Sequence, residues 1–116
     1  MWIVVTDRSD AFDAEAKQNA ERRLRFALSR FDGRITKVEC VIGGPLDRRE
    51  QPERSMRLSL RLRGAEDVVI ADRDTHLERC LARLAERAAR DVRRSIDRAK
   101  FFVPSQTTAK VQRGAS

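Results

Sequence analysis

The residues with the most distinctive chemistry are arginines that recur at steps of three and four near the end of the chain. They are Arg79, Arg83, Arg87, Arg90, Arg94 and Arg98. At ~100° and ~1.5 Å per residue of helix, they fall within an arc of about 100° and form a stripe roughly 28 Å long. A guanidinium keeps its charge at all physiological pH values, and its planar fork can hold two phosphate oxygens at once. The spacing therefore predicts that this helix face binds a polyanion.

Ion pairs between successive turns of a solvated helix are the alternative interpretation. That alternative requires acidic residues interleaved with the arginines, whereas the acidic residues fall outside the arc or close to its edges. They are Glu78, Glu86, Asp91 and Asp97. Because neighbours within the stripe repel one another unless an anion is present, we favour polyanion binding. We expect Arg83→Glu combined with Arg87→Glu to weaken that binding and to leave thermal stability nearly unchanged.

The charge of the whole chain agrees with this interpretation but does not decide it. There are 25 Lys and Arg residues against 18 Asp and Glu, a formal net charge of +7. A GC-rich genome also favours arginine codons, so the placement of the arginines is the stronger argument. A membrane surface is a poorer partner, because the apolar side of this helix is needed to cover a sheet. Sequence-specific reading of DNA is also disfavoured, since no helix-turn-helix or zinc pattern is visible.

Two further basic groups and one aromatic residue lie away from the expected core. On the first helix these are Arg22, Arg23, Arg25 and Arg30, and on the third strand Arg57, Arg61 and Arg63. The strand group is either a secondary contact or a charge that discourages edge aggregation. Phe26 also lies off the apolar stripe of the first helix. Packing against a loop or strand edge is its ordinary interpretation, and stacking on a base is the alternative.

Catalytic and metal chemistry find no support in the sequence. Cys40 and Cys80 have no CxxC spacing and read as buried apolar residues, and the single histidine, His76, cannot complete a metal site with them. No glycine-rich phosphate loop is present. The carboxylates of Asp72 and Asp74 precede a helix, where capping explains them. We therefore expect a protein that is not an enzyme and needs no cofactor, metal or small-molecule substrate. With no signal peptide or membrane span in the sequence, we expect a cytoplasmic location.

Hydrophobic periodicity defines the elements that must position these residues. Strands are expected over 1–6, 35–43, 55–63 and 67–71, and helices over 11–31 and about 75–100. Ser9 or Asp10 would cap the first helix, and Gly33 would end it in the left-handed conformation. Thr75 with Glu78 would form a capping box for the second. Alternating apolar residues in the third strand imply a sheet with one wet face and favour antiparallel pairing.

These elements give the order β-α-β-β-β-α. The prediction is an α+β fold, with a four-stranded sheet and two helices packed on one face. The second helix carries the clearest apolar stripe for such packing: Leu77, Leu81, Leu84, Ala88, Val92, Ile96 and Ala99. One domain is expected over residues 1–100, followed by a flexible tail over residues 101–116.

Four features together resemble the ribosome hibernation-promoting factor and ribosome-associated inhibitor A family, also called sigma-54 modulation proteins. They are LSRFDGRITKVECVIGG at 28–44, SMRLSLRLRG at 55–64, VVIADRDTHLERCLARLAERAARDVRR at 68–94, and the order of the elements. The resemblance implies a fold akin to double-stranded-RNA-binding domains. It also implies binding to rRNA of the small ribosomal subunit, in the channel for messenger and transfer RNA, so that occupancy blocks translation. We expect such a protein to be monomeric when it is off the ribosome.

The resemblance also suggests which residues bind. Arg79, Arg83, Arg87 and Arg90 match basic positions of the family's second helix, and Arg22, Arg23 and Arg30 those of its first; the stripe itself adds Arg94. Two features depart from the family: His76 stands nearest to a common aromatic position, and the dimerising domain of the long forms is missing. Two other functions stay open, an RNA-binding accessory protein of ribosome assembly or translation, and a domain that binds an acidic protein.

Overall fold

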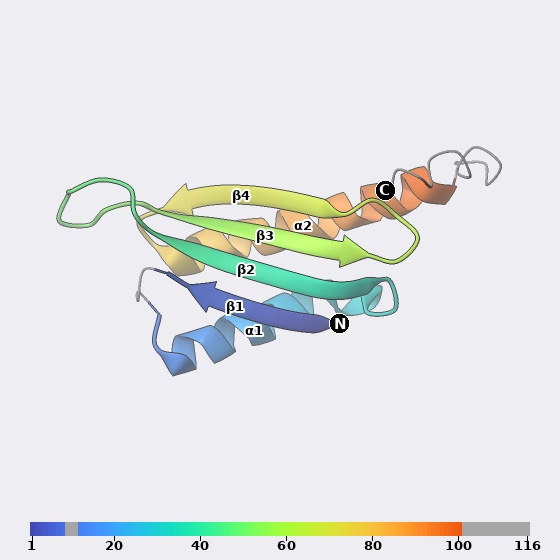
Figure 1. Cartoon of the computed structure of the whole chain (residues 1–116), viewed down its shortest axis with the longest axis horizontal. Helices are drawn as coiled ribbons and strands as arrows, with labels where there is room; N and C mark the ends of the chain where they lie inside the picture. Colours follow the sequence, from blue (N-terminus) through green and yellow to red (C-terminus); the bar gives the residue numbers. More distant parts are fainter. Residues whose placement is uncertain (9–11, 101–116) are drawn as a thin grey trace.

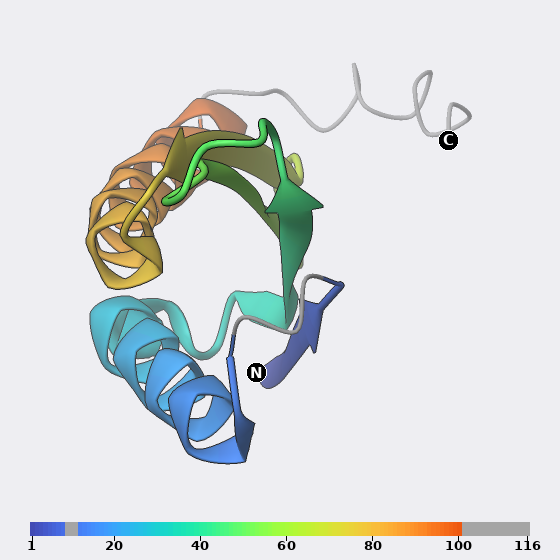
Figure 2. The same cartoon turned by 90° about the vertical axis from the view of Figure 1, so that its left-hand side faces the viewer.

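The computed structural model describes residues 1–8 and 12–100. The elements are β1 (Trp2–Asp7), α1 (Ala14–Leu28), a 3-10 turn η1 (Ser29–Phe31), β2 (Ile35–Pro45), β3 (Arg54–Leu62), β4 (Val68–Asp74) and α2 (Leu77–Lys100) (Figure 1). The strands form one sheet in the order β1-β2-β3-β4. Figure 2 shows both helices on the same face of that sheet, with the other face uncovered. The predicted α+β fold is thus confirmed, while the predicted tail over 101–116 lies outside the described residues.

The sheet is mixed, because the two kinds of connection in the chain impose different pairings. β3 runs antiparallel to both β2 and β4, as its alternation predicted. β1 instead pairs parallel to β2, with Ile3 opposite Val38 and Val5 opposite Cys40. A helix connects these two strands and returns the chain to its starting edge, which is the usual way to join parallel neighbours. α1 therefore crosses the same face that α2 covers.

The core lies between the inward face of the sheet and the two helices. The alternating residues of β2 and β3 are buried there as predicted, among them Val38, Ile42, Leu58 and Leu60. The helices contribute one apolar side each: Ala20, Leu24 and Leu28 from α1, and from α2 the predicted stripe together with Cys80, Ala85 and Ala89. Ala99, at the end of that stripe, is only half-buried.

Both cysteines belong to this core, as expected, and neither is in a disulfide. Burial raises the pKa of the Cys40 thiol to about 12 and that of Cys80 to about 11. Because the thiolate is the reactive species, we expect a disulfide reagent such as DTNB to modify neither thiol in the native protein and both after denaturation. Rapid labelling of the native protein would show that the sheet and α2 separate readily.

α1 begins later than the sequence predicted. Its N-cap is Asp13, whose carboxylate accepts a hydrogen bond of 2.8 Å from the Ala16 N–H. Phe12 precedes the helix and packs, partly buried, against the core. The predicted caps Ser9 and Asp10 lie outside the described residues. The helix prediction began too early because Phe12 fits the apolar period although it belongs to the connection.

The predicted ends next to Gly33 and Thr75 are wrong in their details. α1 continues into η1 without a left-handed glycine; among the glycines of residues 1–8 and 12–100, Gly64 has the positive φ of 72°. At the start of α2, the Thr75 hydroxyl bonds the Asp74 carboxylate and the His76 ring in place of a capping box. Asp74 accepts the hydrogen bond from the His76 N–H at 3.0 Å.

Within the described ranges, neither α1 nor α2 has the length and the hydrophobicity that a membrane-spanning helix requires.

Candidate nucleic-acid interface

The arginine stripe of α2 runs along β4, the strand at one edge of the sheet, and its two halves have different surroundings. In the first half, Arg83 and Arg87 are only about 40% exposed, because they reach back to β4. In the second half, Arg94 and Arg98 are 65% and 63% exposed. The predicted stripe therefore exists, but Arg83 and Arg87 in its middle turn back to β4, while Arg94 and Arg98 project into solvent as the sequence suggested.

In the first half, the arginines meet carboxylates of β4. Arg79 donates to both oxygens of Asp74, from Nε at 2.9 Å and from Nη2 at 2.7 Å. Arg83 donates to Asp72 at 2.9 Å and to Asp74 at 2.8 Å. Asp74 is one of two buried polar residues in the described part of the chain, at 7% exposure. The acidic partners that the stripe lacks on its own helix are thus supplied by the neighbouring strand.

The pKa values of these groups follow from the pairing. Hydrogen bonds from Arg79, from the His76 N–H and from Arg83 hold the pKa of Asp74 far below its usual range. The pKa of Asp72 is lowered mainly by its hydrogen bond from Arg83. The same contacts raise the pKa of Arg79 and Arg83, so all four groups stay charged at neutral pH. Counting Arg87, whose Nη1 lies 3.9 Å from Asp72, three guanidinium groups face two carboxylates.

Two of these arginines also cover the exposed edge of β4. Arg87 donates to the carbonyl of Ala71 at 3.2 Å, and Arg83 donates to that of Arg73 at 3.1 Å. An edge strand with unpaired backbone groups is a template for pairing with other chains. The first half of the stripe therefore has a structural role, which the sequence reasoning missed when it assigned Asp72 and Asp74 to capping alone.

In the second half of α2, the arginines are much freer. Within residues 1–8 and 12–100, Arg90 has no hydrogen-bond, ion-pair or ring partner. Arg94 approaches Asp91 at 3.6 Å, and Arg98 approaches Glu66 at 3.6 Å. Exposed pairs at such distances contribute little to stability and are screened by salt. These guanidinium groups are therefore available to an external phosphate.

The second half of α2 meets η1, the turn that follows α1, at a pair of arginines that share one aromatic ring. The guanidinium carbons of Arg30 and Arg93 lie 5.2 and 5.7 Å from the centroid of the Phe31 ring, which is itself buried. A ring face attracts a cation and fixes its position. The structure thus joins the predicted Arg30 to Arg93, which lies outside the predicted arc and could be found only from the helix packing.

The other α1 candidates lie on its outer side or towards α2. Arg22 is exposed and donates to Asn19 within its own helix. Phe26, four residues before Arg30, is 84% exposed, so its ordinary interpretation as a packed side chain is wrong. An exposed aromatic residue among arginines suits the stacking of an unpaired base.

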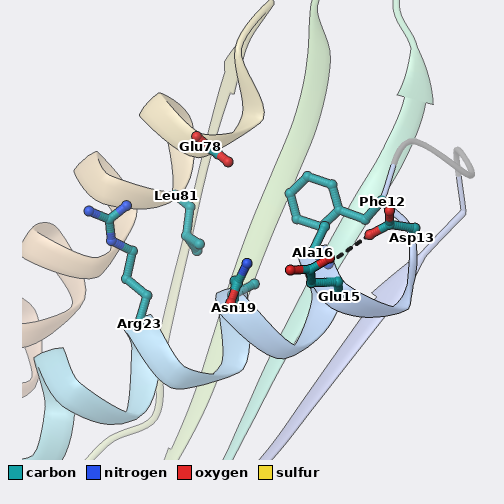
Figure 3. A pocket seen from close by; sticks show the side chains of 9 residues that line it. Phe12, Asp13, Glu15, Ala16, Asn19, Arg23, Glu78 and Leu81 are labelled. Carbon is teal, nitrogen blue, oxygen red and sulfur yellow. Dashed lines mark hydrogen bonds between the residues drawn. The ribbon is translucent and has the colours of Figure 1, made fainter.

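Arg23 lies in a groove of about 350 Å³ between the first halves of α1 and α2. Figure 3 shows its guanidinium near Leu81 of α2, with Glu78 farther along the groove. Asp13 and Glu15 line the end near the start of α1. Because these three carboxylates repel an anion, we expect the interface to lie towards the carboxyl ends of the two helices, where Arg30, Arg90, Arg93 and Arg94 are found.

Several solved structures share this fold, among them the following two. A ribosomal subunit interface protein from Coxiella burnetii aligns with a TM-score of 0.65 over 81% of this chain and 96% of that one, at 11% identity. The chain has the fold of a ribosomal subunit interface protein. The N-terminal domain of Protein Y from Thermus thermophilus aligns with a TM-score of 0.56, over 78% of this chain and 98% of that one, at 17% identity. The predicted resemblance is thereby confirmed at the level of the fold.

At the level of sequence, neither a family model nor a curated protein matches the chain. In the part of the chain that the structure describes, no group of three or more His, Cys, Asp or Glu residues could hold a metal ion.

Proposed function

We propose that this protein binds the small ribosomal subunit, contacts its rRNA in the channel for messenger and transfer RNA, and blocks translation by occupying that channel. The observation that carries the proposal is the fold, which aligns with 96% of the length of a ribosomal subunit interface protein. At 11% identity the fold alone does not transfer a function, so the exposed arginines provide the second support. A cationic surface of this kind is suited to binding in an RNA-lined channel and blocking it by occupancy.

In this proposal, the two halves of the arginine stripe contribute differently. Arg90 and Arg94 on α2 and Arg30 on η1 contact phosphates directly, and Arg93 joins them beside Phe31. Arg22 and Arg23 on α1 lie farther from the carboxyl ends of the two helices and add to the positive potential. Arg79, Arg83 and Arg87 add to the positive potential while their guanidinium groups hold β4. Since each neutralised phosphate releases counterions, affinity should fall steeply as salt increases.

Sedimentation with purified subunits tests the proposal. At low salt, we expect the protein to move with the small subunit through a sucrose gradient and to stay at the top with the large subunit alone. Messenger RNA together with transfer RNA should displace it, because both use the proposed channel. Raised salt should release it as well.

The same experiment separates the two alternative functions. An RNA-binding accessory protein would bind free rRNA equally well and would not be displaced by transfer RNA. A domain for an acidic protein would remain at the top of the gradient with both subunits, and that result would reject the proposal.

A further inference from the structure

The helices leave one face of the sheet uncovered, on the side of the molecule opposite the helical arginines (Figure 2). We call it the open face. Its side chains form rows across the strands, because residues paired in register point the same way. Trp2, Lys37 and Arg61 form one row, and Thr6, Val41, Arg57 and Ala71 another. Val4, Glu39, Ser59 and Val69 lie between them. This arrangement crosses all four strands.

Positive charge predominates on the open face. Lys37, Arg57, Arg61 and Arg73 point outward from it, against Glu39 from the strands. Asp67, just before β4, lines the same shallow hollow as Lys37 and Arg61. Arg73 has a neighbour in the adjoining loop, Glu53, at 3.6 Å. Within the described ranges, the side chains of Arg57 and Arg61 have no hydrogen-bond or ion-pair partner. The face thus offers free guanidinium groups on either side of the row that holds Glu39.

One corner of the face carries an exposed aromatic ring. Trp2 is 66% exposed, although a tryptophan is normally buried where a core is available. The Lys37 ammonium lies 5.2 Å from the centroid of its ring and keeps it at the edge of the sheet. An aromatic ring held beside cations is the combination by which proteins bind single-stranded nucleic acid, the ring stacking on a base and the cations following the backbone.

We propose that this open face binds a single-stranded segment of RNA, with a base on Trp2 and phosphates along Lys37, Arg61 and Arg57. An acidic protein fits less well, because the exposed apolar residues are divided between opposite edges of the sheet, Trp2 on β1 and Val69 on β4. A protein interface would need a contiguous apolar centre. The proposal does not depend on binding to the ribosome, since it concerns the opposite side of the molecule.

Intrinsic fluorescence gives a direct test, because Trp2 is the single tryptophan and the chain has no tyrosine. Titration with a short oligouridylate at low salt should quench the emission to saturation, and added salt should reverse the quenching. With fluorescein-labelled RNA, anisotropy should show about tenfold weaker binding for Trp2→Ala. We expect a similar or larger loss for Arg57→Gln combined with Arg61→Gln. Thermal unfolding should be nearly unchanged in both, because these side chains are exposed.

The matched control changes two arginines on the other side of the molecule. Arg90→Gln with Arg94→Gln should leave the quenching intact, while the variant at Arg57 and Arg61 should still sediment with the small subunit if the proposed function holds. Absence of quenching, or a loss of quenching only in the α2 variant, would overturn the proposal. Equal quenching by polyglutamate at the same salt would also overturn it in favour of an acidic protein.

Discussion

Arg90→Glu combined with Arg94→Glu is expected to weaken binding to the small ribosomal subunit about 100-fold at low salt, since each lost charge-assisted hydrogen bond costs about a factor of ten. The reason is that Arg90 has no partner within the described residues and Arg94 has only a distant one, Asp91 at 3.6 Å. The melting temperature should stay within about 2 °C of the parent value, as for other surface substitutions. Quantitative co-sedimentation over a series of salt concentrations measures the affinity. The slope of log affinity against log salt should also fall by about one for each phosphate contact removed.

A matched control separates a local contact from net charge. Arg48→Glu combined with Arg49→Glu makes the same change in net charge in the loop between β2 and β3, where both side chains are exposed. This variant should lose only the small part of the affinity that comes from long-range attraction, which is screened beyond about 10 Å at ordinary salt. If both variants bind equally weakly, the carboxyl-terminal half of α2 is not the interface.

Asp74→Asn is expected to lower the melting temperature at neutral pH by at least about 5 °C. The buried carboxylate receives hydrogen bonds from Arg79, Arg83 and the His76 N–H, and these bonds join the end of β4 to the start of α2. An amide supplies one acceptor oxygen and no charge, so Arg79 loses its ionic partner and Arg83 keeps only Asp72. Thermal unfolding followed by circular dichroism measures the change. Asp91→Asn, which removes an exposed pair at 3.6 Å, is the control and should shift the melting temperature by less than about 2 °C.

The pH dependence of the difference gives an independent check. The pKa of Asp74 is lower in the folded protein than in the unfolded chain, so its contribution is fully present above the unfolded pKa of about 3.9. That contribution is lost as the pH falls through the folded pKa. The difference between the parent and Asp74→Asn proteins should therefore be largest at pH 5 to 7 and should shrink progressively as the pH falls below about 4. A difference that stays constant down to pH 2 would mean that the substitution acts through packing instead.

The contacts of Arg83 also change the result that we expect from the double substitution Arg83→Glu with Arg87→Glu. The sequence predicted that this pair of changes would weaken binding and leave stability nearly unchanged. Because Arg83 bridges Asp72 and Asp74, a glutamate there would face two carboxylates, and we now expect a loss of stability as well. A fall in ribosome binding by that variant would consequently not identify a phosphate contact, whereas the variant at Arg90 and Arg94 can.

The order of the elements, the burial of alternating residues in β3 and the segregation of arginines on α2 were all readable from the sequence. They depend on local periodicity, which follows directly from the geometry of strands and helices. The parallel pairing of β1 with β2 was not predicted, because it depends on α1 returning the chain to the edge at which β1 begins. The ends of α1 were less predictable, because Phe12 and Asp13 satisfy both a helical pattern and a connecting segment.

Only the tertiary structure decided which arginines are free. The sequence treats Arg83 and Arg90 alike, since they share one arc of one helix. Their difference arises because β4 ends beside the first half of α2 and brings Asp72 and Asp74 to it from another part of the chain. Packing of η1 against α2 likewise brings Arg30 and Arg93 to the same Phe31 ring. Long-range electrostatic partners depend on how elements pack, and helical periodicity contains no information about that arrangement.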